Sequence, residues 1–398
     1  MPDGTASAGL RYAAGLLLSA VFILACYQSA RIVWADVLFR HNSPASVDCA
    51  VRLDPGNARY HAWRAELLSF DGQDPVAELK QSLKLNPRDS AVWIRLAAHA
   101  ENSGDPAAAE RFLQKAAEVD KLFTPRWALM NFYFRQGDAR QFWAWTTESL
   151  RMSYGDLRPL FELCWRMTDD AGAIERAIPA THTILGKYLA FLMGENRLEA
   201  AGPVARRFLK QAAPEDTPLL LSYCDRLLEQ ARIPAALPVW NGLCDRRLLP
   251  YPGLAPERGR LVTNGDFAHT PLERGFDWHG PAVDGVHMAR AGEALQLTFT
   301  GKQPERCRVL WQPVPLAPRT LYRLRFEYRT TGMTAPGAGW DVASRLLPPS
   351  EEWRAEETLF TSGDTAGGQL ALVYQRLPAT MRFQGTFALR RVRLDVAR

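Results

Sequence analysis

Four glutamates near the C-terminus form the clearest arrangement of residues that could do chemistry. Glu351-Glu352 and Glu356-Glu357 flank Trp353, and paired carboxylates are the acid and base of a glycoside hydrolase. That reaction needs one carboxyl group with a raised pKa, which requires burial. The sequence shows no sign of burial around these acids, and they lie in a predicted turn. We therefore interpret them as solvated.

The common sequence signatures of enzymes are absent as well. The chain has no GxSxG, HExxH, P-loop or dinucleotide-binding motif, each of which marks a distinct chemistry. Its seven histidines are scattered, and no motif joins the closest pair, His279 and His287, to a carboxylate or thiol. We expect a protein that is not an enzyme and needs no cofactor or metal. The alternative is a diverged glycan-active enzyme.

Length, charge and cysteine content narrow the remaining classes. A chain of 398 residues is too long for one ordinary core, so two or three domains are expected. Its net charge of +5 includes no basic block, which argues against nucleic-acid binding. Six scattered cysteines without a CxxC motif predict neither a disulfide scaffold nor a zinc site. Cys224 and Cys244 could pair, but two buried free thiols are the favoured interpretation.

An uncharged apolar segment lies near the N-terminus. No residue between Arg11 and Arg31 is charged, and about 19 helical residues at 1.5 Å each span about 28 Å, close to the hydrocarbon thickness of a bilayer. Tyr12, Tyr27 and Trp34 lie near its ends, as interfacial aromatic residues do. We predict a short cytoplasmic tail at 1–11, a transmembrane anchor or export signal at 12–34, and an extracytoplasmic location for the rest.

Two alternatives to an uncleaved anchor remain open. A cleaved signal peptide would need an A-x-A-like site of small residues, and none is clear. Ile23-Leu24-Ala25-Cys26 resembles a bacterial lipobox, which implies Cys26 as a lipid acceptor, although Leu24 is bulky for its position.

Residues 40–250 carry a repeated pattern. Leu53-Asp54-Pro55-Gly56-Asn57 recurs as Leu85-Asn86-Pro87-Arg88-Asp89, and a similar interval separates Trp93 from Trp127. This periodicity resembles tetratricopeptide repeats, which are helix–turn–helix units of about 34 residues. The repeat that begins at Ser90 fits best. Segments 183–210 and 217–247 continue as predicted helix pairs, each interrupted by turn residues.

The resemblance implies stacked helix pairs with a concave groove for a protein partner. First-helix residues would line this groove, and His61, Asn102 and Arg135 are our candidates. Each of them is also an ordinary polar surface residue. The aromatic residues between Trp127 and Trp145 recur at helical spacing, so we expect them in the core rather than in a binding cage.

After a predicted Pro- and Gly-rich linker at 251–258, the pattern changes to period two. Residues 322–329 alternate strictly between apolar and polar side chains, which is typical of a half-buried antiparallel strand. Shorter runs at 294–299, 307–313, 369–375 and 386–396 predict further strands. Several short strands in about 140 residues indicate an all-β sandwich or jelly roll over 259–398.

The start of this region resembles carbohydrate-binding modules of the galactose-binding-like jelly-roll type. The resemblance rests on Leu261-Val262-Thr263-Asn264-Gly265-Asp266-Phe267 followed by Gly275-Phe276-Asp277-Trp278. It implies an aromatic residue that stacks on a pyranose ring and polar groups that reach its hydroxyls. The candidates are Trp278, Trp340, Trp353, Asp341, Gln312 and Arg345. We expect a loop to expose Trp340, while Trp278 and Gln312 are favoured as structural residues that close one end of the sandwich.

The whole arrangement resembles bacterial envelope proteins associated with exopolysaccharide production or export. This resemblance implies an inner-membrane scaffold with its bulk in the periplasm, whose repeats recruit protein partners and whose sandwich touches polysaccharide. A purely structural scaffold without any small ligand is the remaining alternative.

Overall fold

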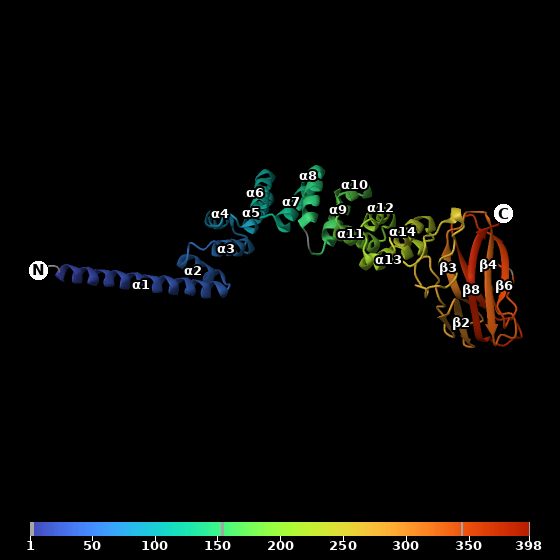
Figure 1. The fold of residues 1–398 in the computed structure, drawn as a ribbon. Helices are drawn as coiled ribbons and strands as arrows, with labels where there is room; N and C mark the ends of the chain where they lie inside the picture. Colours follow the sequence, from blue (N-terminus) through green and yellow to red (C-terminus); the bar gives the residue numbers. More distant parts are fainter. Residues whose placement is uncertain (1–3, 153–154, 344, 398) are drawn as a thin grey trace. The chain divides into compact units, whose positions relative to one another are not determined.

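A computed structural model of the protein describes residues 4–152, 155–343 and 345–397 (Figure 1). Residues 1–3 of the predicted cytoplasmic tail lie outside this part. The chain forms two compact units, Met1–Asp169 and Asp170–Arg398. Helices occupy the first unit and the start of the second, and an antiparallel β-sandwich follows. This is the predicted fold class.

The first helix, α1 (Gly4–Arg40), has two different parts. From Ala13 onward it is long and apolar enough to cross a membrane, judged by length and composition, and none of its most apolar stretch is buried. Large side chains such as Phe22 and Ile23 are about two-thirds exposed, at 68% and 67%. Its last turns instead pack into the protein, because Ala35 and Phe39 lie in one core cluster with residues of the next two helices.

Helix hairpins make up the rest of the first unit. The helices are α2 (Pro44–Leu53), α3 (Ala58–Phe70), α4 (Val76–Leu85), α5 (Ser90–Asn102), α6 (Pro106–Val119), α7 (Phe123–Gln136), α8 (Ala139–Met152) and α9 (Arg158–Met167). The last residue of each repeated motif begins a helix: the Asn57 side chain accepts a hydrogen bond from the Arg59 amide, and that of Asp89 accepts from Ala91 and Val92. These bonds satisfy amides that a helix start leaves unpaired.

The best-fitting repeat forms the predicted pair. Leu96 lies in the α5 core, and Ala109, Leu113 and Ala116 are buried on α6. Gly104 has a φ of +80° in the turn between them, a conformation that glycine adopts without strain. Among the aromatic residues expected in the core, Phe132, Tyr133 and Phe142 are buried. The predicted helix pair is confirmed, whereas the core prediction holds for only part of the aromatic stretch, because Trp127, Phe134, Trp143 and Trp145 are half-buried.

The second unit opens with five more α-helices. They are α10 (Ala171–Ala177), α11 (His182–Gly194), α12 (Leu198–Leu209), α13 (Thr217–Glu229) and α14 (Ile233–Asp245). The predicted breaks near 194–196 and 232–234 are confirmed. The segment predicted as a linker is packed rather than free, because Tyr251 is buried and its hydroxyl donates to Asp277 at 2.7 Å. Because this segment packs on the sandwich, it does not separate two domains as a free linker would. The domain bounds of 40–250 and 259–398 stay predictions.

Two antiparallel sheets enclose the core of the sandwich. Their strands are β1 (Val286–Ala291), β2 (Ala294–Thr300), β3 (Arg306–Val314), β4 (Leu321–Thr331), β5 (Ala338–Trp340), β6 (Arg354–Thr361), β7 (Gly368–Gln375) and β8 (Gln384–Val396). One sheet has the order β1-β2-β8-β4-β6 and the other the order β3-β7-β5. The alternating exposure along β4 follows the period-two pattern of its sequence.

The strands β1, β5 and β6 were not predicted from the sequence. The prediction that Glu356 and Glu357 lie in a turn is wrong, because both belong to the edge strand β6. Glu356 is not solvated either: its side chain is 8% exposed and pairs with Arg345 at 2.6 Å and Arg354 at 2.9 Å. An edge strand covered by charged residues has little apolar alternation, which is why its sequence reads as a turn.

Candidate functional site

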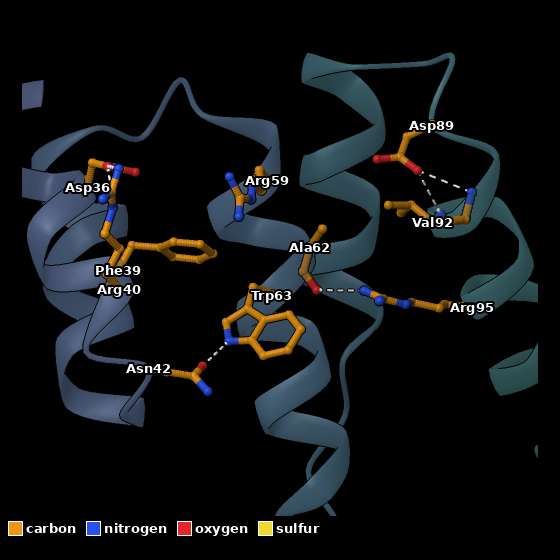
Figure 2. Close-up of a pocket in the computed structure, with 11 residues that line it drawn as sticks. Asp36, Phe39, Arg40, Asn42, Arg59, Ala62, Trp63, Asp89, Val92 and Arg95 are labelled. Carbon is orange, nitrogen blue, oxygen red and sulfur yellow. Dashed lines mark hydrogen bonds and ion pairs between the residues drawn. The ribbon is translucent and has the colours of Figure 1, made fainter.

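A cavity of about 710 Å³ lies between α1, α3 and α5 in the first unit, and we call it the groove (Figure 2). Its lining residues come from the end of α1 and from the first helices of two successive repeats. They are Asp36, Phe39, Arg40, Asn42, Arg59, Ala62, Trp63, Asp89, Ala91, Val92 and Arg95. The groove thus begins where the membrane-type helix ends.

Equivalent positions of the two repeats face the groove. Arg59 and Ala91 are each the second residue of their helix, and Trp63 and Arg95 are each the sixth. Both pairs have the same spacing as the repeated motif, which relates Leu53 to Leu85. These groove residues were not predicted from the sequence, although the spacing of the motif relates each of them to its equivalent in the next repeat.

Most charges in the groove are already paired. Arg40 contacts Asp36 at 2.8 Å, and Arg95 contacts Glu66 at 3.1 Å and donates to the Ala62 carbonyl at 3.2 Å. Arg59 differs, because its guanidinium lies 5.0 Å from the centre of the Phe39 ring and forms no ion pair with a carboxylate of the described chain. Figure 2 shows Phe39 of α1 pointing toward the α3 residues Arg59 and Trp63. The groove therefore combines aromatic surface with one arginine that has no ion pair, and the Asp89 carboxylate at the start of α5 lines it as well.

His61 does not line the groove. Its side chain is buried, with Nδ1 2.7 Å from Glu78 and Nε2 3.1 Å from the carbonyl of Pro55. The equivalent residue of the next repeat, Trp93, donates in the same way to the carbonyl of Pro87 at 2.9 Å. Both side chains hold the loop that precedes their own helix. The expectation that His61 faces a partner is therefore wrong, because its side chain lies on the buried face of α3.

The other two predicted groove residues also lie outside the groove. Asn102 is exposed at the C-terminal end of α5. Arg135 makes a bidentate ion pair with Glu101, at 2.8 and 2.7 Å, which links α7 to α5. This hydrogen bond from Arg135 lowers the pKa of Glu101. Arg135 therefore joins adjacent repeats.

Three of the predicted sugar-binding residues lie in the sandwich core. Trp278 and Gln312 are fully buried, and the Gln312 amide exchanges two hydrogen bonds with the backbone of Thr263, at 3.1 and 2.9 Å. This geometry agrees with the interpretation of Trp278 and Gln312 as structural residues. Trp340 is 2% exposed and packs against Trp278 and Phe326. The expectation that a loop exposes Trp340 is wrong, because β5 carries it into the core between the sheets.

The remaining three lie nearer the surface. The Asp341 carboxylate accepts a hydrogen bond from the Ala371 amide at 3.1 Å, and burial raises its pKa. Arg345 pairs with Glu356. Trp353 is half-buried, with the guanidinium groups of Arg390 and Arg329 4.1 and 5.2 Å from its ring centre. The structure does not gather these six residues into one site.

All six cysteines are free. Cys224 and Cys244 are both buried, as in the favoured interpretation, and burial raises the pKa of Cys224 well above its usual value. Cys26 is exposed on α1.

Comparisons with known proteins add little to this description. No family model matches the chain, and no curated protein matches it. Among solved structures, the MamA protein is 12% identical with a TM-score of 0.33, over 43% of this chain and 94% of MamA. PilW, described as a type IV pilus biogenesis factor, is 14% identical with a TM-score of 0.27, over 56% and 94%. A CBM4 structure is 12% identical with a TM-score of 0.27, over 34% and 99%.

Proposed function

We propose that this chain is a membrane-anchored scaffold that holds a partner protein in the groove and contacts glycan through its sandwich. The observation that carries the first half is the unpaired Arg59 guanidinium over Phe39, in a groove that starts at the end of an apolar helix. A cation beside aromatic surface suits a segment with a carboxylate next to a large apolar side chain. The partner is therefore a protein with an acidic, apolar segment near the membrane.

The direct test is peptide binding to the full chain in lipid nanodiscs. Ten-residue peptides that pair Asp or Glu with Leu, Phe or Trp are compared with the same peptides carrying Asn or Gln. Arg59→Gln should weaken the best acidic peptide about tenfold, since a charge-assisted hydrogen bond contributes about 1.5–3 kcal/mol. The matched control is Arg111→Gln, which removes an exposed arginine of α6 outside the groove. Equal binding by Arg59→Gln and wild type would reject the groove as the site.

The proposed location is the inner membrane, with the bulk of the chain in the periplasm. It is supported by the length and composition of α1 and by the exposed apolar side chains along it. Protease added to spheroplasts should degrade the repeats and the sandwich. Protection of both until the membrane is lysed would place them in the cytoplasm instead.

The glycan half of the proposal rests on Trp353. Of the three predicted tryptophans, Trp353 is partly exposed, whereas Trp278 and Trp340 lie in the core. Trp353→Ala should weaken binding to glycan, measured on a glycan array with the full chain. Unchanged glycan binding by this variant would show that Trp353 is not part of the site.

A role in exopolysaccharide production or export is supported by the resemblance of the domain order alone. Deletion of the gene should lower secreted polysaccharide, and reintroduction of the Arg59→Gln form should restore it incompletely. Normal secretion by the deletion strain would reject this role.

A further inference from the structure

A second cavity lies within the second unit, where α13 and α14 pack against the sandwich, and we call it the junction pocket. Its volume is about 660 Å³. Four segments that are far apart in the sequence contribute to its walls: 225–233, 273–279, 311–313 and 365–369. A cavity of this size with mixed apolar and polar walls is typical of a small-ligand site.

The walls of the junction pocket are held in place by close contacts. The Asp225 carboxylate of α13 accepts hydrogen bonds from Arg274 Nε at 2.8 Å and from the Gly275 amide at 2.6 Å. Opposite them, Gly367 leaves no room for a side chain, since a Cβ atom there would lie 2.5 Å from Ile233. A site with fixed walls loses little entropy when it binds.

The charged residues that line the junction pocket are acidic, and one arginine, Arg308, lies behind the lining, where it contacts Trp311 and Gln369. Asp225, Glu229 and Glu273 line it, and none of its lining residues is a lysine or arginine. Asp225 is paired with Arg274, but Glu229 and Glu273 are exposed and make no ion pair within the described chain. Carboxylates at the mouth of an apolar cleft concentrate a negative potential there. The complementary ligand carries a positive charge.

One wall is aromatic and apolar. The imidazole of His279 stacks on Trp311, with ring centres 3.9 Å apart and planes 10° apart, beside Pro313 and Ile233. Burial lowers the pKa of His279, so its ring is neutral at neutral pH and does not offset the carboxylates. The Arg308 guanidinium also lies 4.9 Å from the centre of the Trp311 ring, so the wall offers ring edges, Pro313 and Ile233 to a ligand with an apolar face.

Polar groups lie at the start of β7 and on the loop that precedes it. The Thr365 side chain is exposed there, and Gln369 uses its Oε1 to accept from Arg308, which leaves its NH₂ group to donate. Such groups, spread around an apolar wall, match a ring that has hydroxyls on its rim. A lysine or arginine side chain offers polar atoms at its tip alone.

We propose that the junction pocket binds an amino sugar, a hexosamine unit of a glycan whose primary amine is protonated. The ammonium group lies by Glu229 and Glu273, the apolar face of the ring packs on the Trp311–His279 wall, and the hydroxyls reach Thr365 and Gln369. This inference goes beyond the proposed function, whose glycan half rests on Trp353 outside the pocket, and it names the class of sugar.

The test is calorimetric titration of the full chain in nanodiscs with two ligands of the same backbone. One is the β-1,4 hexamer of glucosamine, and the other is its fully N-acetylated form, which lacks the charge. The glucosamine hexamer should bind at least tenfold more tightly. Glu229→Gln combined with Glu273→Gln should remove that preference, whereas Glu293→Gln, an exposed acid outside the pocket, should leave it. Matching melting curves confirm that the variants are folded.

Three outcomes would overturn the inference. Equal binding of the two hexamers, lost in Trp353→Ala, would keep glycan binding in the proposed function and reject the amine-specific pocket. A preference for glucosamine that survives both glutamine substitutions would indicate unspecific attraction elsewhere. Tighter binding of hexalysine than of the glucosamine hexamer, lost in the double variant, would assign the pocket to a basic peptide.

Discussion

The groove and the junction pocket have similar volumes, about 710 and 660 Å³, but opposite charge. Three arginines and two aspartates line the groove, and two of the arginines are paired with nearby acids. Carboxylates line the junction pocket, and two of the three have no ion pair in the described chain. The groove therefore presents one arginine without an ion pair, Arg59, whereas the pocket presents two such carboxylates, Glu229 and Glu273.

The two cavities also differ in how the chain builds them. The groove is assembled from the end of α1 and two successive repeats, so its residues recur at the spacing of the repeated motif. The junction pocket needs segments as far apart in the sequence as 225–233 and 365–369. A substitution in one cavity should consequently change the stability and ligand binding of its own unit and leave those of the other unit unchanged. Variants in each cavity can test this.

The largest expected effect is on the groove side. Phe39→Ala removes a ring that packs on Tyr60, with ring centres 4.7 Å apart, and anchors the end of α1 in the first core cluster. Loss of a buried phenylalanine should lower the free energy of unfolding of the first unit by about 3 kcal/mol. Urea titration followed by hydrogen exchange of α1–α3 measures it. Phe70→Ala, at a 79% exposed side chain, is the control. A cost below about 1 kcal/mol would contradict the anchoring of α1.

The corresponding variant at the junction is Asp225→Ala. It leaves Arg274 and the Gly275 amide without their shared acceptor, so the second unit should lose about 2 kcal/mol of stability. Glu229→Ala, at an exposed acid of the same helix, should change stability by less than about 0.5 kcal/mol. Equal effects of the two variants would show that Asp225 does not hold the helices on the sandwich.

Charge reversal sharpens the contrast between the two cavities. Arg59→Glu should invert the preference of the groove, so that a peptide with Lys in place of Asp or Glu binds more tightly than the acidic one, by about tenfold or 1.4 kcal/mol. The same variant should leave binding of the glucosamine hexamer unchanged, because Arg59 is not part of the junction pocket. Fluorescence anisotropy measures the peptides and calorimetry the hexamer. Weaker binding of the glucosamine hexamer by this variant would show that the two cavities are not independent.

The sequence predicts the elements better than it predicts the sites. The period-two alternation along β4 and the motif around Pro55 and Pro87 each depend on local pattern, and both predictions are confirmed. Trp340 could not be placed in this way, since its burial depends on the pairing of β5 with β7.

His61 illustrates a second limit. A polar residue of a predicted helix looks exposed in the sequence, but the His61 side chain is buried and lies 2.7 Å from Glu78 of the next helix. The junction pocket could not be predicted from the sequence either. Glu229 and Trp311 line one cavity only because segments far apart in the chain pack together.

The smallest expected effect compares how two acids, one in each unit, respond to pH. Burial raises the pKa of Asp277 above 3.8, so between its unfolded and folded values the native state holds more protons. Its stabilising contribution is full below the unfolded value and is lost as pH rises through the folded one. Glu101 has the opposite sign: its hydrogen bond from Arg135 lowers its pKa below 4.5, so its contribution is lost as pH falls through that lowered value.

Unfolding titrations between pH 7 and 3 on wild type, Asp277→Asn and Glu101→Gln separate the two contributions. Relative to Asp277→Asn, the second unit of the wild type should gain stability on acidification toward pH 4. Relative to Glu101→Gln, the first unit of the wild type should lose stability below about pH 4.5. A parallel response of both units would mean that the Asp277 carboxylate, although it accepts hydrogen bonds from Tyr251 and two backbone amides, is as well solvated as in the unfolded chain. Burial at the junction would then not control its protonation.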